Sequence, residues 1–123
     1  LHCSSAASDV YKRQEEKFSG WPRVINHLVG VAEILKEQGA PEYLQIAGLY
    51  HSIYGERQVG NFGYSLITRE ELQELIGIQA EEVVHTWCDL EAPRTDNIHN
   101  MSDSQLKSDL LKLEKANIDE MKS

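Results

Sequence analysis

The feature that most constrains the fold is a helical apolar repeat in residues 24–35, which runs directly into a second helical segment. Gly39 suits the left-handed position just past a helix end, and Pro41 suits the first turn of the next helix. The spacing of the repeat places its side chains on one face of an α-helix, so two consecutive helices with a tight turn are predicted. The repeat consists of Val24, Leu28, Val31 and Leu35.

Two histidines lie on the apolar faces of these predicted helices. His27 follows Val24 by three residues and precedes Val31 by four, so its imidazole should point toward the core. His51 follows Leu44 along one line of the second helix, and it should face inward near the helix end. A single inward histidine is more often a core residue than a ligand-binding one, so the two histidines must be weighed together with other polar residues.

The later part of the chain also has helical spacing, and the predicted fold class is all-α, a bundle of about five helices. Thr68 and Glu71 form a capping box that opens a short helix ending at Gly77. Residues 55–66 are expected to form either a loop over the two histidines or a simple connector whose aromatic side chains fill the edge of the core. Residues 91–101 are expected to form an irregular, polar segment in which Arg94 is solvated. A helix over residues 79–90 should turn four side chains inward: Val83, Val84, Trp87 and Cys88.

The last helix is expected to begin at a second capping box, Ser102 to Gln105. Its apolar line contains one polar member, Asn117. A buried polar group needs a hydrogen-bond partner, and three such residues on three helices favour a shared pocket. The apolar line is Leu106, Leu110, Leu113, Asn117 and Met121, and the predicted pocket residues are His27, His51, Ser52, Tyr54 and Asn117.

The amino terminus has a different character from the rest of the chain. Residues 4–14, SSAASDVYKRQ, resemble the translation of a sequencing adapter. We therefore expect residues 1–14 to be artefactual or disordered, and residues 15–123 to be one helical domain from a metagenomic fragment that lacks its natural start. Cys88 is then the remaining cysteine, which excludes an intrachain disulfide and indicates a reducing, cytoplasmic location.

The charge balance limits the partners that the chain can have. Asp and Glu number 20 against 12 Lys and Arg, a formal net charge of −8. This excess argues against a nucleic-acid backbone or an anionic membrane surface as partner. A small-molecule ligand is compatible with this charge, and the oligomeric state is left open.

The order of His27, a short helix pair and an apolar run that ends in His51 resembles the first two motifs of the HD superfamily of metal-dependent phosphohydrolases. The run Ala47–Ser52, AGLYHS, is similar to the superfamily's AALLHD. A more specific resemblance is to an HD-like family without established activity, a domain of unknown function with a His-Ser-x-Tyr-Gly motif. The residues that carry it are Asn26-His27-Leu28, the run GLYHSIYG and Ala116-Asn117. The resemblance implies an HD-domain-like helical bundle. It also implies a metal set of His, His-Asp and Asp, in which Ser52 and Asn117 stand where the two aspartates are expected.

The missing carboxylates bear directly on metal binding. Hard divalent cations need anionic oxygens, and a catalytic zinc site normally has three protein ligands. His27 and His51 could supply two of these, with Glu56, His85 or Asp89 as the third. However, His85 has Glu81 and Asp89 four residues to either side, which favours an exposed, charge-paired position.

Three functions follow from these residues. The leading hypothesis is a degenerate HD-like domain that binds a small phosphorylated or nucleotide-like ligand or performs metal-free chemistry. The first alternative is a metal-dependent phosphohydrolase with a non-standard ligand set, so whether the chain is an enzyme stays open. The second alternative is a non-catalytic structural or interaction module. No cofactor is assigned, and a divalent metal is left open.

Overall fold

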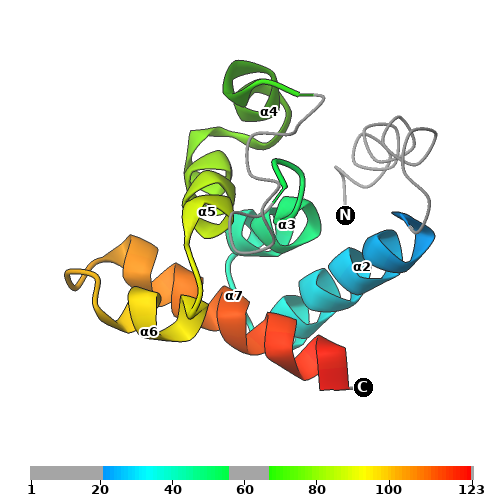
Figure 1. Cartoon of the computed structure of the whole chain (residues 1–123). Helices are drawn as coiled ribbons and strands as arrows, with labels where there is room; N and C mark the ends of the chain where they lie inside the picture. Colours follow the sequence, from blue (N-terminus) through cyan, green and yellow to red (C-terminus); the bar gives the residue numbers. More distant parts are fainter. Residues whose placement is uncertain (1–20, 56–66, 123) are drawn as a thin grey trace.

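The computed structural model describes residues 21–55 and 67–122, with the backbone alone for residues 21–23. Within these ranges the chain is all-α, as predicted, and forms six helices (Figure 1). The sequence indicated about five, and α6 is the addition. The helices are α2 (Trp21–Glu37), α3 (Glu42–Tyr50), α4 (Arg69–Ile76), α5 (Ile78–Asp89), α6 (Arg94–His99) and α7 (Gln105–Lys122).

Helices α2 and α3 form the tightly packed pair that the apolar repeat predicted. Gly39 adopts a left-handed conformation with φ of 76° in the turn between them. The helices approach so closely that a Cβ on Gly48 would lie 2.7 Å from Cδ1 of Leu35. Since cores are packed at crystal-like density, glycine at this position lets α3 lie against α2 without displacing its leucine. The repeat residues Leu28, Val31 and Leu35 are fully buried beneath this crossing.

The capping box and the inward face of α5 are confirmed. The Thr68 hydroxyl accepts from the Glu71 backbone N–H, and the Glu71 carboxylate accepts from that of Thr68. Gly77 ends α4 with a positive φ of 90°. The four α5 residues expected in the core, Val83, Val84, Trp87 and Cys88, are all buried.

The expectation of an irregular segment over residues 91–101 is wrong, because α6 forms there. Its Ile98 side chain is fully buried, and this anchor makes the short helix part of the core. Arg94 is also buried, not solvated as expected. Its guanidinium carbon lies 3.9 Å from the centroid of the Trp87 ring, a cation–π contact.

The last helix begins later than the sequence indicated. Ser104, and not Ser102, caps α7, because its Oγ accepts from the Lys107 backbone N–H at 3.1 Å. Met121 was placed on the inward line, but it is exposed. Glu120 points toward α2 instead, and a helical residue one position later lies about 100° further around the axis. Met121 therefore faces away from α2.

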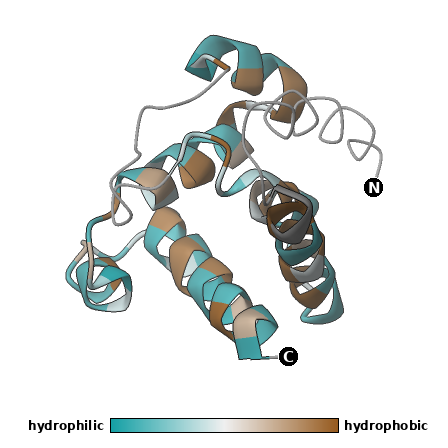
Figure 2. Cartoon of the chain, turned by 45° about the vertical axis from the view of Figure 1, so that its right-hand side comes forward, coloured by the Kyte–Doolittle hydropathy of each residue, from teal (hydrophilic) through white to brown (hydrophobic). Residues whose placement is uncertain are grey.

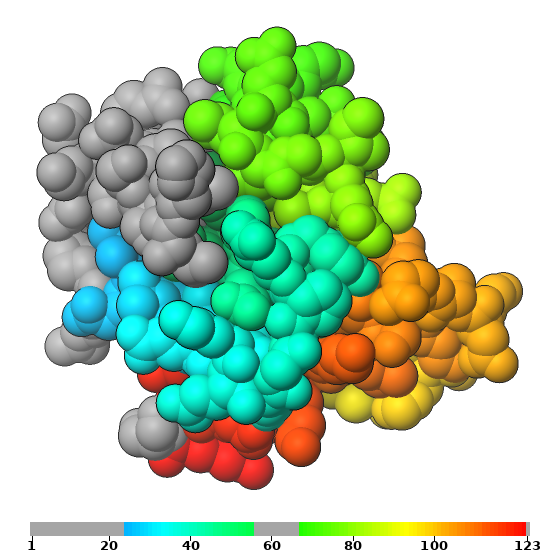
Figure 3. All heavy atoms as spheres, turned by 180° about the vertical axis from the view of Figure 1, so that it is seen from behind, coloured from blue at the N-terminus to red at the C-terminus, as the bar shows by residue number. Residues whose placement is uncertain are grey.

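Helix α7 lies across the body of the molecule and packs against α2, α3, α5 and α6 (Figure 2). Seen from behind, α7 emerges beneath α2 and α3 (Figure 3). The Tyr43 hydroxyl of α3 donates to Asp109 of α7 at 2.7 Å, which ties α3 to the amino-terminal half of α7. Burial, with the Asp109 carboxylate, raises the pKa of Tyr43 to about 12. No helix in the described part of the chain could span a bilayer.

A buried carboxylate joins α4 to α5 and to the turn after α3. The Glu81 side chain accepts two hydrogen bonds from Arg69, at 2.8 and 2.9 Å. It also accepts from the Tyr54 hydroxyl at 2.8 Å and the Gln73 amide at 3.1 Å. Burial alone would raise the pKa of Glu81, but these donors outweigh it and hold the pKa below its ordinary value. Glu81 is therefore ionised inside the fold.

Removing this carboxylate should destabilise the protein. We expect Glu81→Ala to lower the free energy of unfolding by about 2–3 kcal/mol, since the Tyr54 hydroxyl would lose its buried acceptor. The matched control is Glu82→Ala, which removes the same charge from the exposed neighbouring position and should cost less than about 0.5 kcal/mol. Urea unfolding of the three proteins measures the difference. Equal losses for both variants would contradict a structural role for the buried carboxylate.

Candidate functional site

Three polar side chains that the sequence singled out meet where α2, α3 and α7 come together. Nε2 of His27 on α2 lies 2.7 Å from Oδ1 of Asn117 on α7. The ring of His51, which caps α3, lies edge-on to the ring of His27, with centroids 5.4 Å apart and planes inclined at 73°. His51 is 1% exposed and Asn117 is 8% exposed, so these two line the interior. We refer to His27, His51 and Asn117, with Glu120, as the polar cluster.

Glu120 is the member of the polar cluster that the sequence analysis missed. Its carboxylate forms an ion pair with Nδ1 of His27. Glu120 lies three residues after Asn117, and residues at this spacing share one face of a helix. This spacing was the available signal. Gly30 makes room for the contact, because a Cβ there would lie 2.7 Å from Cγ of Glu120.

The hydrogen bonds of His27 fix the orientation of its ring. A ring nitrogen that faces a carboxylate donates its proton, so Nδ1 carries a hydrogen. The other nitrogen, Nε2, faces the amide oxygen of Asn117 and donates to it when the ring carries both protons. In that form the contact with Glu120 is a charge-assisted hydrogen bond, the stronger class of such bonds. Both edges of the ring are therefore held by side chains of α7.

His51 has the opposite character, because it is held as a neutral ring. Its Nδ1 lies 2.6 Å from the Gly48 carbonyl oxygen, which can only accept, so the proton is on Nδ1. Burial, together with the positive charges of His27 and Arg94, lowers the pKa of His51 to about 4, although the hydrogen bonds to Gly48 and Asn117 act in the opposite direction. Nε2 therefore carries a lone pair at neutral pH and can accept a hydrogen bond. The Trp87 ring packs edge-on against the His51 ring, with the two ring centroids 5.5 Å apart.

A second pair of charged residues, Arg94 and Glu114, lies near His51. Behind His51, the Arg94 guanidinium stacks on Trp87 and has one nitrogen 4.0 Å from a carboxylate oxygen of Glu114. The Thr95 hydroxyl donates to the same carboxylate at 2.7 Å. The site thus offers imidazole and amide donors within a largely apolar frame, as ligand-binding sites commonly do.

Two further predicted pocket residues follow α3. Ser52 is half-buried beside His51, and its backbone carbonyl accepts from the Gly55 N–H at 3.1 Å. Tyr54 is buried, but its hydroxyl donates to Glu81. Its hydroxyl is therefore committed to the contacts between α4 and α5 and not to His27 or Asn117.

The residues considered as a third metal ligand lie in different places. The His85 ring packs edge-on against that of Tyr54, with centroids 5.8 Å apart. The prediction that His85 lies in an exposed position and pairs with Glu81 is wrong, because Glu81 is fully buried and bound by Arg69. Asp89 is exposed on α5. Glu56 and the expected loop over residues 56–66 lie outside the described residues, as do residues 1–14.

The two-metal centre that the HD resemblance implies does not fit the donors seen here. Within residues 21–55 and 67–122, no three His, Cys, Asp or Glu side chains are grouped so that they could hold a metal ion. Both nitrogens of His27 are engaged by Asn117 and Glu120. Nδ1 of His51 is bound to the Gly48 carbonyl. A metal would have to break one of the bonds to His27, and Ser52 and Asn117 supply no negative charge in return.

A surface pocket of about 240 Å³ lies apart from the polar cluster, where α6 meets α7. Its lining combines the apolar side chains of Leu111 and Ile118 with polar and charged ones. His27, His51 and Asn117 are not among its lining residues, which are Thr95, His99, Leu111, Glu114, Lys115, Ile118 and Asp119.

The buried neutral His51 should make stability depend on pH. Above about pH 6.5 the ring is neutral in both states, and as the pH falls toward about 4 only the unfolded chain takes up the proton. The contribution of neutral His51 to the free energy of unfolding is therefore fully present above pH 6.5 and is lost on acidification. The loss is at most roughly 3 kcal/mol, because one pKa unit corresponds to ~1.4 kcal/mol.

The measurement is urea unfolding at a series of pH values for the wild type, His51→Gln and the control His99→Gln. We expect His51→Gln to lose this part of the pH dependence, and His99→Gln, at an exposed position, to keep it. Parallel pH profiles for the wild type and His51→Gln would show that the ring of His51 titrates normally.

Comparison with known proteins gives one match. A family model described as "Domain of unknown function (DUF6817)" matches residues 14–92. No curated protein and no solved structure matches the chain. The match includes α2, α3, α4 and α5, and therefore His27 and His51, while Asn117 and Glu120 on α7 lie beyond its end.

Proposed function

The chain belongs to the DUF6817 family of domains of unknown function, and from this premise we propose that it is an HD-like domain that binds a small molecule. The ligand class we propose is a small phosphorylated or nucleotide-like compound. The proposed pocket is lined by His27, His51, Ser52 and Asn117.

One observation carries the proposal, namely that polar side chains from α2, α7 and the end of α3 converge on one point of the fold. Burying an imidazole or an amide costs free energy unless it is hydrogen-bonded. A core of leucine and valine would avoid this cost, so a cluster of such groups is a reason to look for a ligand. His27 and Asn117 bond each other across α2 and α7, and His51 stands beside them.

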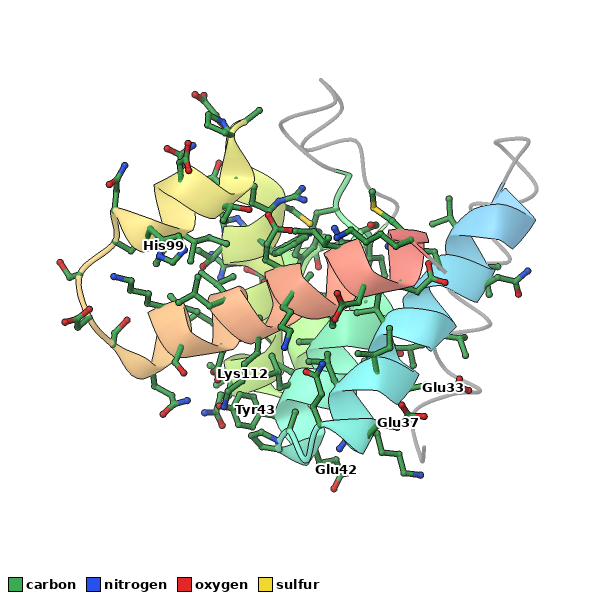
Figure 4. The ribbon with its side chains drawn as sticks, turned by 90° about the horizontal axis from the view of Figure 1, so that it is seen from below. Glu33, Glu37, Glu42, Tyr43, His99 and Lys112 are labelled. Atoms are coloured by element: carbon green, nitrogen blue, oxygen red, sulfur yellow. The ribbon has the colours of Figure 1, made fainter. Side chains whose placement is uncertain are left out.

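The charges near the cluster support an anionic ligand. The Arg94 guanidinium is positively charged and lies close enough to depress the pKa of His51. Phosphate oxygens are strong acceptors for such donors. The outer surface is different, because Glu33, Glu37 and Glu42 extend from the end of α2 and the start of α3 (Figure 4). This acidic surface supports a compact anion at the cluster over a long nucleic acid.

The HD-like relationship is part of the proposal, and the spatial order of the motif residues supports it. The first His, the paired His and the late Asp of an HD enzyme correspond to His27, His51 and Asn117, and here these three are neighbours. With Ser and Asn in place of both aspartates, the carboxylates that would hold two metals are lacking. Binding without metal-dependent hydrolysis is therefore the function we favour.

Ligand binding can be tested by thermal unfolding in the presence of nucleotides and sugar phosphates. A ligand that binds only the folded state must stabilise it, by ~2.7 kcal/mol at 100 times its Kd. We expect at least one phosphorylated compound to raise the Tm by several degrees, and expect His27→Gln to abolish this rise. The matched control is His99→Gln, a histidine outside the cluster, which should keep it.

Two results would count against a ligand at this cluster. If no probe raises the Tm of the wild type, the domain is better described as a structural or interaction module. If the rise is equal in the wild type and in His27→Gln, the ligand binds elsewhere.

The metal-dependent phosphohydrolase is tested separately by elemental analysis of protein purified without chelator. We expect less than one metal ion per chain, because the bonds from Asn117 and Glu120 occupy both nitrogens of His27. Stoichiometric metal that is lost in His51→Ala would instead support the phosphohydrolase. His85→Ala serves as the control, since His85 packs against Tyr54.

A further inference from the structure

We propose that the pocket between α6 and α7 is a second binding site, and that it takes a free α-amino acid with an aliphatic side chain. The residues of the polar cluster do not line this pocket. The inference therefore goes beyond the proposed function and does not rest on it. Helices α6 and α7 lie side by side (Figure 4), and side chains from both form the walls of the pocket.

A buried carboxylate with unused hydrogen-bonding capacity forms part of the pocket wall. Glu114 lines the pocket, although its side chain belongs to the interior and the residue is only 7% exposed. Its Oε2 accepts from the Thr95 hydroxyl, and its Oε1 lies 4.0 Å from an Arg94 nitrogen, which is longer than a hydrogen bond. Among residues 21–55 and 67–122, Thr95 is the one hydrogen-bond donor to this carboxylate, which can accept about four.

The most suitable partner for such a carboxylate is a positively charged donor. Hydrogen bonds between an ammonium group and a carboxylate are stronger than those between neutral groups, and an ammonium group has three protons to donate. Asp119 lines the same pocket and adds a second negative charge. The pocket should therefore attract the ammonium group of a ligand.

A lysine in the lining sets a second requirement. Lys115 is exposed on α7, and in the part of the chain that the structure describes its ammonium group forms no ion pair. A ligand with only a positive charge would be repelled by Lys115, and a ligand with only a negative charge by Glu114 and Asp119. An α-amino acid carries both charges on groups attached to one carbon atom, so it can satisfy both requirements.

The remaining lining residues define the rest of the ligand. Leu111 and Ile118 are half-buried and lie seven residues apart, which places them on one face of α7. They offer apolar contact to an aliphatic side chain. The pocket volume of about 240 Å³ is below the range of roughly 300–1,000 Å³ that is typical for drug-sized ligands. A compact amino acid of the size of valine or leucine therefore suits it.

The ligand class is tested by isothermal titration of the full chain at neutral pH. The probes are L-valine, L-leucine and two analogues of leucine, each of which lacks one charge. 3-Methylbutan-1-amine lacks the carboxylate, and 4-methylpentanoate lacks the ammonium group. We expect at least one of the two amino acids to bind, and both analogues to bind at least fivefold more weakly than leucine.

Three variants locate the binding in the pocket. Lys115→Gln should weaken leucine binding at least fivefold, whereas Lys112→Gln removes the same charge from an exposed position outside the lining and should bind within twofold of the wild type. Glu114→Gln keeps an acceptor for Thr95 but removes the charge, and it should weaken binding at least tenfold. Urea unfolding shows whether this buried variant is folded. If it is not, Lys115→Gln still provides the test, because Lys115 is exposed.

A fourth variant, His27→Gln, separates this pocket from the polar cluster, and it should bind leucine within twofold of the wild type. Loss of leucine binding in His27→Gln would place the amino acid at the polar cluster and overturn the inference. An equal loss in Lys112→Gln and Lys115→Gln, or an analogue that binds as tightly as leucine, would also overturn it. If neither amino acid binds at millimolar concentration, the inference fails, while the proposed function at the polar cluster stands.

Discussion

The hydrogen bond between His27 and Asn117 is the interaction on which the site depends. It joins α2 to α7 at a part-buried position, where an unpaired imidazole or amide would be costly. It also sets the position of the neighbouring groups. Glu120 reaches the other nitrogen of His27 because it lies one helical turn beyond Asn117. A chain without α7 would leave His27 without both of these partners.

The two histidines illustrate how different the surroundings of the same side chain can be within one cluster. His51 is enclosed by Trp87 and by its own helix end, and desolvation keeps it neutral. His27 is less buried, and its Nδ1 faces the Glu120 carboxylate. An imidazole acceptor beside an imidazole donor is an arrangement that can orient a polar ligand. The Arg94 charge behind His51 reinforces this difference.

Local rules predicted the parts of the fold that depend on local spacing. The α2 repeat, the Thr68 capping box and the glycine ends followed from periodicity and capping. The formation of α6 did not, because Ile98 is stabilised by burial in the core and Arg94 by the Trp87 ring of α5, contacts that the spacing within residues 91–101 does not show. Asn117 was identified as a polar residue on an apolar line. Glu120 shares a helix face with Asn117, but its contact with His27 also depends on the space over Gly30 on α2, which the sequence of α7 does not show.

The most direct test of the central claim is a double-mutant cycle on His27 and Asn117. The free energy of unfolding is measured for the wild type, His27→Ala, Asn117→Ala and the double variant. If the two side chains bond each other inside the protein, their coupling energy should be about 1 kcal/mol or more. Losses that add to within ~0.3 kcal/mol would show that the side chains do not interact, and the polar cluster would then not exist as described.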